Sequence, residues 1–458
     1  MLFQSWIFLL FFAVFYPVYL AVKNTPLRLP WLLAGSYVFY GWLNPFYLLL
    51  ILYATTVDYL AALAMARWRP KRLWLILSIG NDLALLGTFK YAGFLAENLN
   101  WLLSAAHVPY HVPAPGLLLP IGLSFFLFQS MTYTIDFYRG QVPLERNFLR
   151  YAAFVSLFTQ LLSGPIERAR NLLPQLRGPV RITWQDAADA ASLFTVGFFK
   201  KVALADALAL YVNKVYGAPQ EYPSTALWLA TFAYAWQIYF DFSGYTDMAR
   251  GVARLLGIRV MLNFNNPYLA TGIGDFWRRW HISLSSWFRD YVYIPLGGSR
   301  NGELATYRNV FLTMLVSGLW HGAMWTFVIW GAWHGLGAVL TRRLERAAFW
   351  QERVPKLLKQ ALTFAWVTFA WIFFRADSVP QALTIIRRSF DFQWRDPGAP
   401  VLLVGLVLAV WLYQFLYESP GRRVIEWAPV RFGLVVAMIV YCAVFMAAGE
   451  KGFIYLQF

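Results

Sequence analysis

Long apolar segments separated by short polar breaks run along most of the chain. A helix that crosses a bilayer needs about 20 mainly apolar residues. Helical segments of this kind are predicted at 5–22, 31–43, 46–66, 73–92, 117–137, 148–165, 188–212, 224–243, 309–340, 361–375, 401–417 and 432–449. Several of them are shorter than a full span. The pattern predicts an all-α, polytopic integral membrane protein, organised as a single transmembrane domain over residues 1–458.

Two of these segments do not fit a simple crossing. Basic residues flank 148–165 on both sides, and they also flank 309–340. One straight helix cannot leave and re-enter the same face of a membrane, so each segment is predicted to be broken or re-entrant and shielded by protein. In 309–340 the expected break lies around Gly318 and Gly322, beside His321.

Composition supports the membrane assignment. Hydrophobic residues make up 59% of the 458 positions, aromatic residues 19% and charged residues only 14%, whereas soluble domains carry about 25% charged residues. The net charge of +16 comes from short basic clusters between apolar runs, such as 67–72 and 342–359. These clusters indicate cytoplasmic loops and contact with anionic membrane lipid, and we predict no nucleic-acid partner. The single cysteine, Cys442, permits no intramolecular disulfide.

The stretch from Asn263 to Arg300 is too polar to span a membrane. We expect a helix over 275–294, with Trp277, Trp280, His281, Leu284, Phe288 and Tyr291 on one face. Arg278, Arg279 and Arg289 would lie mostly elsewhere, where guanidinium groups suit a phosphate-bearing donor. The alternative is an interfacial helix whose arginines bind lipid phosphate.

Three histidines lie in or beside apolar segments. An imidazole deep in a membrane is costly, so His321 is expected to be functional. His281 can also be a packed histidine bonded to a carbonyl, and His334 is the weaker candidate. No spacing among the histidines makes a zinc motif, so no metal site is predicted. Polar residues recur in other segments, which favours an enzyme or a transporter: Ser124, Gln129, Asp136, Gln160, Glu167, Asp241 and Asp247.

Several motifs together resemble the membrane-bound O-acyltransferase (MBOAT) family, and most of all its bacterial alginate O-acetyltransferase branch. They are "PIGLSFFLFQ", "LLSGPIER", "YFDFSGYTDMA", "NFNNPY", "FWRRWHISLSSWFRDYVYIPLGG", "SGLWHG", "WIFFRA" and the terminal "FIYLQF". They occur in family order from about Ser36 to Phe458. No single motif carries the resemblance, but the set is specific.

The resemblance implies a ring of about 11 transmembrane helices, with re-entrant and interfacial helices around a central tunnel. It also implies transfer of an acetyl group from a cytoplasmic thioester across the membrane to a hydroxyl of an exported polysaccharide such as alginate. His321 and His281 match the family's two active-site positions, so both are predicted to be catalytic. Substrate contacts are expected from Asn263, Arg278, Arg279, Trp280, Ser317 and Trp320.

The expected donor is acetyl-CoA or another acetyl thioester, with no bound cofactor. The expected partners are membrane lipid and periplasmic acetyltransferases of a polysaccharide export system, and the expected location is the bacterial inner membrane, crossed several times. A neutral imidazole in a site of low dielectric constant can accept the proton of the attacking hydroxyl. His281 would orient a substrate or polarise the carbonyl.

Four alternatives stay open. An acyl-enzyme at Ser317 is possible chemistry, although a serine in a helix break is often a structural cap. The acceptor can instead be peptidoglycan. A related enzyme reaction is D-alanyl transfer to teichoic acid. A transporter or flippase would share the polar interior and broken helices but would not need His321 to accept a proton.

Overall fold

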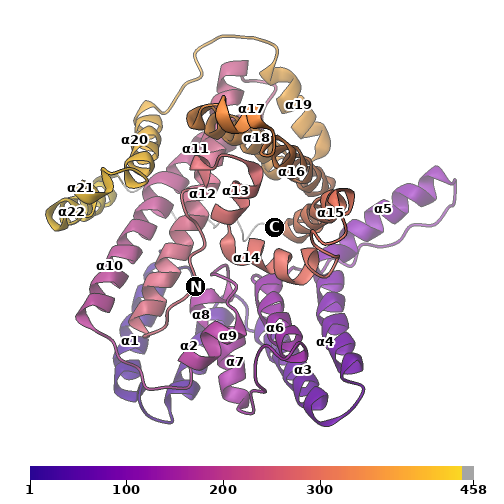
Figure 1. The fold of residues 1–458 in the computed structure, drawn as a ribbon, viewed down its shortest axis with the longest axis vertical. Coiled ribbons are helices and arrows are strands. Elements are labelled where there is room, and N and C mark those ends of the chain that lie inside the picture. The colour runs from indigo at the N-terminus through magenta and orange to yellow at the C-terminus, as the bar shows by residue number, and fades with distance from the viewer. Residues whose placement is uncertain (446–458) are drawn as a thin grey trace. The chain divides into compact units, whose positions relative to one another are not determined.

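The computed structural model describes residues 1–445, and this part of the chain consists of helices and connecting loops without a strand (Figure 1). The described chain separates into two compact units. Unit 1 holds residues 1–194 and 248–261, and unit 2 holds residues 195–247 and those from 262 onward. The prediction of a single transmembrane domain stays a prediction.

Unit 1 is built from the first half of the chain. Its elements are α1 (Trp6–Val22), α2 (Arg28–Gly41), α3 (Tyr47–Arg67), α4 (Lys71–Leu86), the π-helical turn η1 (Gly87–Tyr91), α5 (Ala92–Ala105), α6 (Leu123–Tyr138), α7 (Phe148–Ser156), α8 (Phe158–Leu161), α9 (Ala169–Gln175) and most of α10 (Trp184–Phe198). Helices α3, α4 and α6 pack against one another. Helix α5 continues the helical run of α4 and η1 to Ala105, because this stretch keeps helix-forming Ala and Leu without a proline.

Unit 2 begins with the π-helical turn η2 (Phe199–Ala205). It continues with α11 (Asp206–Gly217), most of α12 (Ser224–Leu255), the 3₁₀ turn η3 (Pro267–Leu269), α13 (Ile273–Arg279), α14 (Ile282–Phe288), the π-helical turn η4 (Arg289–Tyr293), α15 (Glu303–His321), α16 (Trp325–Leu344), α17 (Ala348–Glu352), α18 (Lys356–Arg375), α19 (Val379–Ser389), α20 (Val401–Tyr417), α21 (Arg422–Ile425) and α22 (Ala428–Phe445).

Four helical stretches within residues 1–445 are long and apolar enough to cross a membrane. They are α3, the continuous run Lys71–Ala105, α18 and α22. Three shorter apolar stretches, α1, Phe148–Leu161 and α20, fall below a full span. The structure therefore supports an all-helical membrane protein, while the predicted count of about 11 spans stays a prediction.

The break predicted within 148–165 is confirmed. The α7 helix ends at Ser156, Leu157 adopts an extended conformation with ψ 121°, and α8 begins at Phe158. The backbone N–H of Phe158 donates to Oγ of Ser36, 3.1 Å away. A side chain thus satisfies a backbone donor that the interruption would leave unpaired.

The break predicted within 309–340 is also confirmed. The α15 helix ends at His321, Gly322 is extended, and α16 begins at Trp325. The two helices form a closely packed hairpin (Figure 1). A Cβ on Gly331 would lie 2.6 Å from the carbonyl oxygen of Met314, and a Cβ on Gly318 would meet the carbonyl oxygen of Phe327. The small residues therefore allow the backbones to approach closely, as in other membrane helix pairs.

The single helix predicted over 275–294 is wrong. The chain forms α13, then turns at Trp280 and His281, and continues as α14 and η4. His281 has φ 43° and ψ 53°, a left-handed conformation that ends one helix before the next begins. The shared face expected from helical spacing is consequently divided between two elements.

The polar interior expected from the sequence is confirmed in unit 1. Nε2 of Gln129 donates to Oε1 of Gln160 at 3.2 Å. Oε1 of Gln129 accepts from the backbone N–H of Glu167 at 3.3 Å. A second cluster centres on the buried Asp58, which accepts from Ser78 at 2.6 Å. Buried polar groups in this unit thus pair with neighbouring helices.

In unit 2, the acidic residues of α12 pair with lysines of η2. Nζ of Lys201 lies 2.6 Å from Asp241 and 2.8 Å from Asp206. The side chains of Lys201 and Asp241 are buried, and that of Asp206 is partly exposed. Lys200 pairs with Asp247 at 2.7 Å. These contacts join η2 and α11 to the middle of α12.

Candidate active site

The side chain of Asn263 holds His281 in place. Oδ1 of Asn263 accepts hydrogen bonds from the backbone N–H of Ser283 at 3.1 Å and from its hydroxyl at 2.9 Å. The same oxygen lies 3.2 Å from Nδ1 of His281. Asn263 and His281 are both buried. The turn between α13 and α14 therefore places His281 against an amide oxygen whose orientation the Ser283 backbone N–H fixes.

These contacts determine the tautomer of His281. An amide oxygen can only accept hydrogen bonds, so Nδ1 of His281 carries the proton and Nε2 carries the lone pair. Burial lowers the pKa of His281 from 6.5 to about 3, because the charged imidazolium loses hydration. The ring is therefore neutral near pH 7, with its lone pair on Nε2. Phe242 of α12 packs edge-on against it, 4.6 Å between ring centroids.

The ring of Trp320 lies close to both predicted catalytic histidines. Its ring centroid is 6.2 Å from that of His281 and 5.0 Å from that of His321. His321 is the last residue of α15 and is buried. Its ring also contacts Trp330 of α16 at 5.0 Å and Phe374 of α18 at 5.3 Å. The structure thus brings His281, Trp320 and His321 together, and it places His321 at the helix interruption among protein side chains.

A cavity of about 260 Å³ lies beside this cluster in unit 2. Its lining comes from α13 (Gly274, Trp277), α14 (Leu284, Ser285, Phe288), η4 (Arg289, Tyr293), α15 (Val310, Thr313, Met314, Ser317) and α16 (Ala338, Arg342). The α15 residues are spaced three and four apart, so they form one face of that helix, and His321 is the next residue on this face. The cavity therefore follows α15 towards His321.

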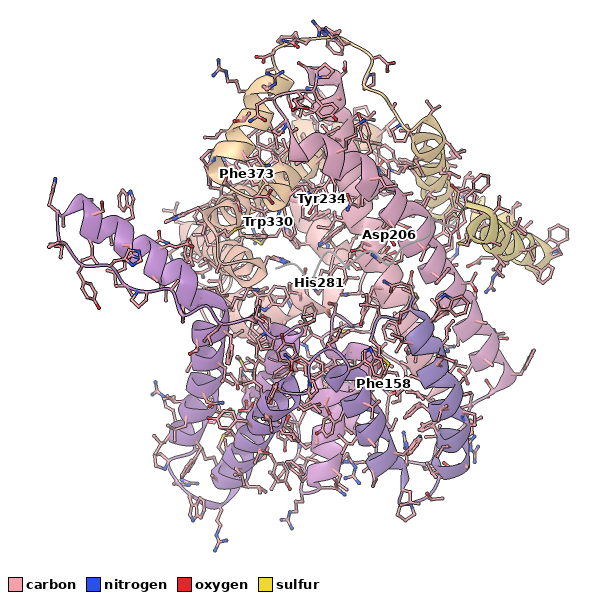
Figure 2. All side chains as sticks on the ribbon, turned by 180° about the vertical axis from the view of Figure 1, so that it is seen from behind. Phe158, Asp206, Tyr234, His281, Trp330 and Phe373 are labelled. Carbon is pink, nitrogen blue, oxygen red and sulfur yellow. The ribbon has the colours of Figure 1, made fainter. Side chains whose placement is uncertain are left out.

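The predicted substrate-binding residues occupy different surroundings. Ser317 lines the cavity. Trp280 is buried in an aromatic core, 5.1 Å from Trp371 and 5.5 Å from Phe276 between ring centroids. His281 and Trp330 lie in the interior of unit 2 (Figure 2). Trp280 thus contributes packing that supports the turn, whereas Ser317 faces the cavity directly.

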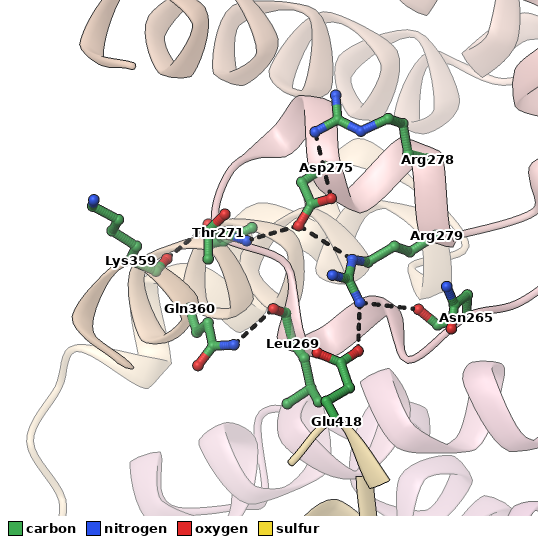
Figure 3. A network of polar contacts seen from close by, with 10 residues as sticks. Asn265, Leu269, Thr271, Asp275, Arg278, Arg279, Lys359, Gln360 and Glu418 are labelled. Atoms are coloured by element: carbon green, nitrogen blue, oxygen red, sulfur yellow. Dashed lines mark hydrogen bonds and ion pairs between the residues drawn. The ribbon is translucent and has the colours of Figure 1, made fainter. Parts of the chain in front are cut away.

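Neither Arg278 nor Arg279 lines the cavity, although the sequence predicts that both bind substrate. Arg278 is exposed and lies 3.4 Å from Asp275. Arg279 forms ion pairs with Asp275 at 3.2 Å and with Glu418 at 2.6 Å (Figure 3). Two carboxylates already neutralise the Arg279 guanidinium, which ties α13 to the end of α20. The role of Arg278 and Arg279 in substrate binding stays a prediction.

Sequence reasoning missed Arg342, the second arginine of the cavity lining after Arg289. Arg342 belongs to a basic cluster that indicated only a cytoplasmic loop. A signal was present, because Arg342 lies eight residues after His334 and four after Ala338, on one face of a helix. The terminal motif 453–458 lies outside the described residues.

The chain is similar to several known proteins. The model of the membrane-bound O-acyltransferase family matches residues 136–374, which include both histidines. The chain is 42% identical to the probable alginate O-acetylase AlgI of Pseudomonas putida, over 91% of this chain and 86% of the relative. It is 43% identical to the protein of that name in Pseudomonas aeruginosa, over 86% and 75% of the two chains. It is 36% identical to the peptidoglycan O-acetyltransferase of Helicobacter pylori, over 80% and 74%.

Proposed function

Because the chain belongs to the membrane-bound O-acyltransferase family and is an O-acyltransferase, we propose that it transfers acetyl groups to an exported polysaccharide. The donor is acetyl-CoA or another acetyl thioester on the cytoplasmic side. The acceptor is a hydroxyl of a polysaccharide such as alginate, reached directly or through a periplasmic acetyltransferase partner. The observation that carries this proposal is the buried array of His281, Trp320 and His321 beside the cavity.

The proposed chemistry requires one base that later acts as an acid. A ring nitrogen of His321 takes the proton from the acceptor hydroxyl while the hydroxyl oxygen attacks the thioester carbonyl carbon. A tetrahedral intermediate forms, the carbon–sulfur bond breaks, and the proton passes from His321 to the leaving sulfur. The products are an acetyl ester and a free thiol. General-base catalysis of this kind contributes about 10²–10⁴-fold to the rate.

His281 has a supporting role in this proposal. Its Nδ1–H is directed at Asn263, and its Nε2 lies on the opposite side of the ring. A neutral imidazole in this tautomer can accept a hydrogen bond from the attacking hydroxyl and so orient it towards the carbonyl. Trp320 lies close to both imidazoles, and the hydroxyl would bind along its edge.

The cavity is proposed as the donor's approach, part of a central tunnel. Its lining is mainly apolar, which suits a narrow thioester arm and excludes the water that would hydrolyse it. Arg289 and Arg342 offer guanidinium groups for the donor's phosphates. Ser317 also lines the cavity, so an acetyl-serine intermediate is the rival mechanism. Trapping with acetyl-labelled donor, followed by mass spectrometry of Ser317, separates the two mechanisms.

The acceptor and the donor carrier each have a rival. A peptidoglycan hydroxyl can replace the polysaccharide hydroxyl without a change in the site's chemistry, and acceptor assays decide between them. D-Alanyl transfer to teichoic acid would use a carrier-protein thioester instead. Identity to acetyl-transferring relatives over most of the chain favours the acetyl donor. We further propose that the protein crosses the bacterial inner membrane several times and works with periplasmic acetyltransferases.

The decisive experiment makes the same histidine-to-glutamine substitution at two positions. His321→Gln in the full-length protein should reduce acetyl transfer at least about 10²-fold, since an amide cannot accept and return a proton at neutral pH. His107→Gln is the control, because His107 is exposed in a loop. Transfer is measured as polysaccharide acetylation per membrane-inserted protein. Substantial residual activity in His321→Gln, at normal insertion, would favour a transporter and contradict the proposal.

A further inference from the structure

Three aromatic side chains with polar ring atoms contact one another next to the cavity. Ring centroids of Trp277 and His334 lie 5.1 Å apart, those of Trp330 and His334 lie 4.7 Å apart, and those of Trp277 and Trp330 lie 5.7 Å apart. Trp330 and His334 are fully buried in α16, and Trp277 belongs to α13. We refer to these three residues as the indole–imidazole cluster.

The nitrogens of this cluster have no hydrogen-bond partner among residues 1–445. This holds for Nε1 of Trp277, Nε1 of Trp330, and both ring nitrogens of His334. An unpaired buried polar group costs about 1–3 kcal/mol, so four of them on three touching rings are not expected in an unliganded, dry core. The cluster is consequently suited to bind a polar group that enters from outside the fold.

Two other tryptophans of unit 2, Trp333 and Trp371, have indole N–H groups that are paired within the protein, whereas those of Trp236, Trp366 and Trp411 have no partner among the described residues. Nε1 of Trp333, on the same helix, donates to the carbonyl oxygen of Trp366 at 3.1 Å. Nε1 of Trp371 donates to the hydroxyl of Tyr268 at 3.2 Å. Both of these N–H groups are satisfied within the protein. Trp333 therefore provides a matched control for Trp330, three residues away and with the same side chain.

The cluster adjoins the cavity. Trp277 is part of the cavity lining, and so is Ala338, one helical turn after His334 on the same face of α16. On α15, the lining likewise ends one turn before His321. A molecule that enters along this cavity would reach the cluster and His321 at a similar depth.

We propose that the indole–imidazole cluster binds an amide group in the donor's thioester-bearing arm; this inference rests on the proposed function. A neutral imidazole offers one donor and one acceptor, and the two indoles offer one donor each. An amide has a carbonyl that accepts and an N–H that donates, so it complements this set. A pantetheine arm carries amides between its phosphate and its thiol. A hydrocarbon chain would leave all four nitrogens unpaired.

The test compares two donors of equal length in nanodiscs containing the full-length protein. One donor is S-acetylpantetheine, and the other has both amides replaced by CH₂–CH₂ units. The wild-type protein should prefer the amide donor by about ten- to a hundredfold in kcat/KM, since each neutral hydrogen bond is worth about three- to tenfold. Free pantetheine should inhibit more strongly than its analogue without amides.

Substitutions assign this preference to the cluster. Trp330→Phe keeps a ring but removes the N–H, so the preference should fall about three- to tenfold. Trp333→Phe should retain the wild-type preference. His334→Gln, which keeps a donor and an acceptor, should retain more of it than His334→Leu. If Trp330→Phe does not yield monodisperse protein, Trp277→Phe is measured in its place, and the same fall is expected.

Each result has a defined meaning. If the wild-type protein transfers acetyl from no thioester, the proposed function fails. If it uses both donors equally well, or if Trp330→Phe and Trp333→Phe change the preference alike, this inference is overturned while the proposed function stands. Ordered water would then be the occupant of the cluster.

Discussion

The amide oxygen of Asn263 lies 3.2 Å from Nδ1 of His281 and orients a histidine that has a left-handed backbone conformation. Ser283 donates to the same oxygen through its backbone and its hydroxyl. A non-glycine residue in this region of the Ramachandran plot is uncommon and costs free energy, which the surrounding contacts must offset. The turn thus holds a neutral imidazole whose ring centroid lies 6.2 Å from that of Trp320.

Replacing Asn263 with Asp should introduce a pH dependence. Burial lowers the pKa of His281 to about 3, so the ring is neutral at working pH. A carboxylate beside Nδ1–H favours the imidazolium and raises this pKa by about 1–3 units. Acetyl transfer by Asn263→Asp should therefore fall as the pH decreases towards about 5 and recover as the pH rises. The measurement is kcat/KM against pH.

Asn263→Ala is the matched control, because it removes the hydrogen bond without adding charge. It should lower kcat at every pH and leave the position of the acidic limb unchanged. If Asn263→Asp shows the wild-type profile, the protonation state of His281 has no influence on the rate.

The close crossing of α15 and α16 predicts a strong effect of one methyl group. A Cβ on Gly331 would lie 2.6 Å from the carbonyl oxygen of Met314 and 3.2 Å from Cα of Leu315, and both neighbours are backbone atoms that cannot rotate away. Gly331→Ala should destabilise the protein by about 1–3 kcal/mol, as overpacking generally does. Thermal unfolding of the detergent-solubilised protein measures this change.

Gly80→Ala provides the comparison within a helix. Apart from its chain neighbours and the backbone of its own helix, no heavy atom lies within 4 Å of a Cβ built on Gly80, so the substitution should be neutral or slightly stabilising. Equal unfolding midpoints for the two variants would contradict the close crossing.

The sequence predicted the helix interruptions well, because they follow from local rules. Basic flanks on both sides of an apolar segment require a return to the same face, and Gly322 is extended at the predicted break. The turn at His281 could not be predicted in this way. Its conformation depends on Asn263, eighteen residues away, and helical spacing contains no information about such a contact.

The cavity lining was only partly predictable for the same reason. Ser317 was identified through its proximity to His321 in the sequence, whereas Arg342 and Trp277 reach the cavity through the packing of α13 and α16 against α15. Arg278 and Arg279 were identified by charge alone. The ion pair of Arg279 with Glu418, 139 residues away in the sequence, became apparent only from the folded chain.

The lysine between two aspartates should be essential for folding. Lys201 is buried and lies 2.6 Å from Asp241 and 2.8 Å from Asp206. Lys201→Met would leave these carboxylates without their cation, and breaking a buried pair in this way costs about 3–5 kcal/mol. The expected result is a large loss of monodisperse protein on size-exclusion chromatography. Arg422→Met, which removes an exposed pair with Glu426, should behave as wild type. Similar yields for the two variants would contradict the prediction.

Two neighbouring arginines of α16, Arg342 and Arg343, allow a test of whether the cavity binds the donor's phosphates. Arg342 lines the cavity, whereas its neighbour Arg343 is exposed and outside the lining. A charge-assisted hydrogen bond to phosphate is worth about 1.5–3 kcal/mol, so Arg342→Glu should raise KM for acetyl-CoA at least about tenfold. Arg343→Glu makes the same change in net charge and should raise KM much less. The comparison therefore separates a specific contact from the general electrostatic field at the membrane surface, which salt would screen for both variants.

With S-acetylpantetheine, which lacks the phosphates of CoA, the difference between the two variants should disappear. If both reversals weaken acetyl-CoA use equally, the arginines act only through the surface charge, and the cavity is not where the phosphates bind.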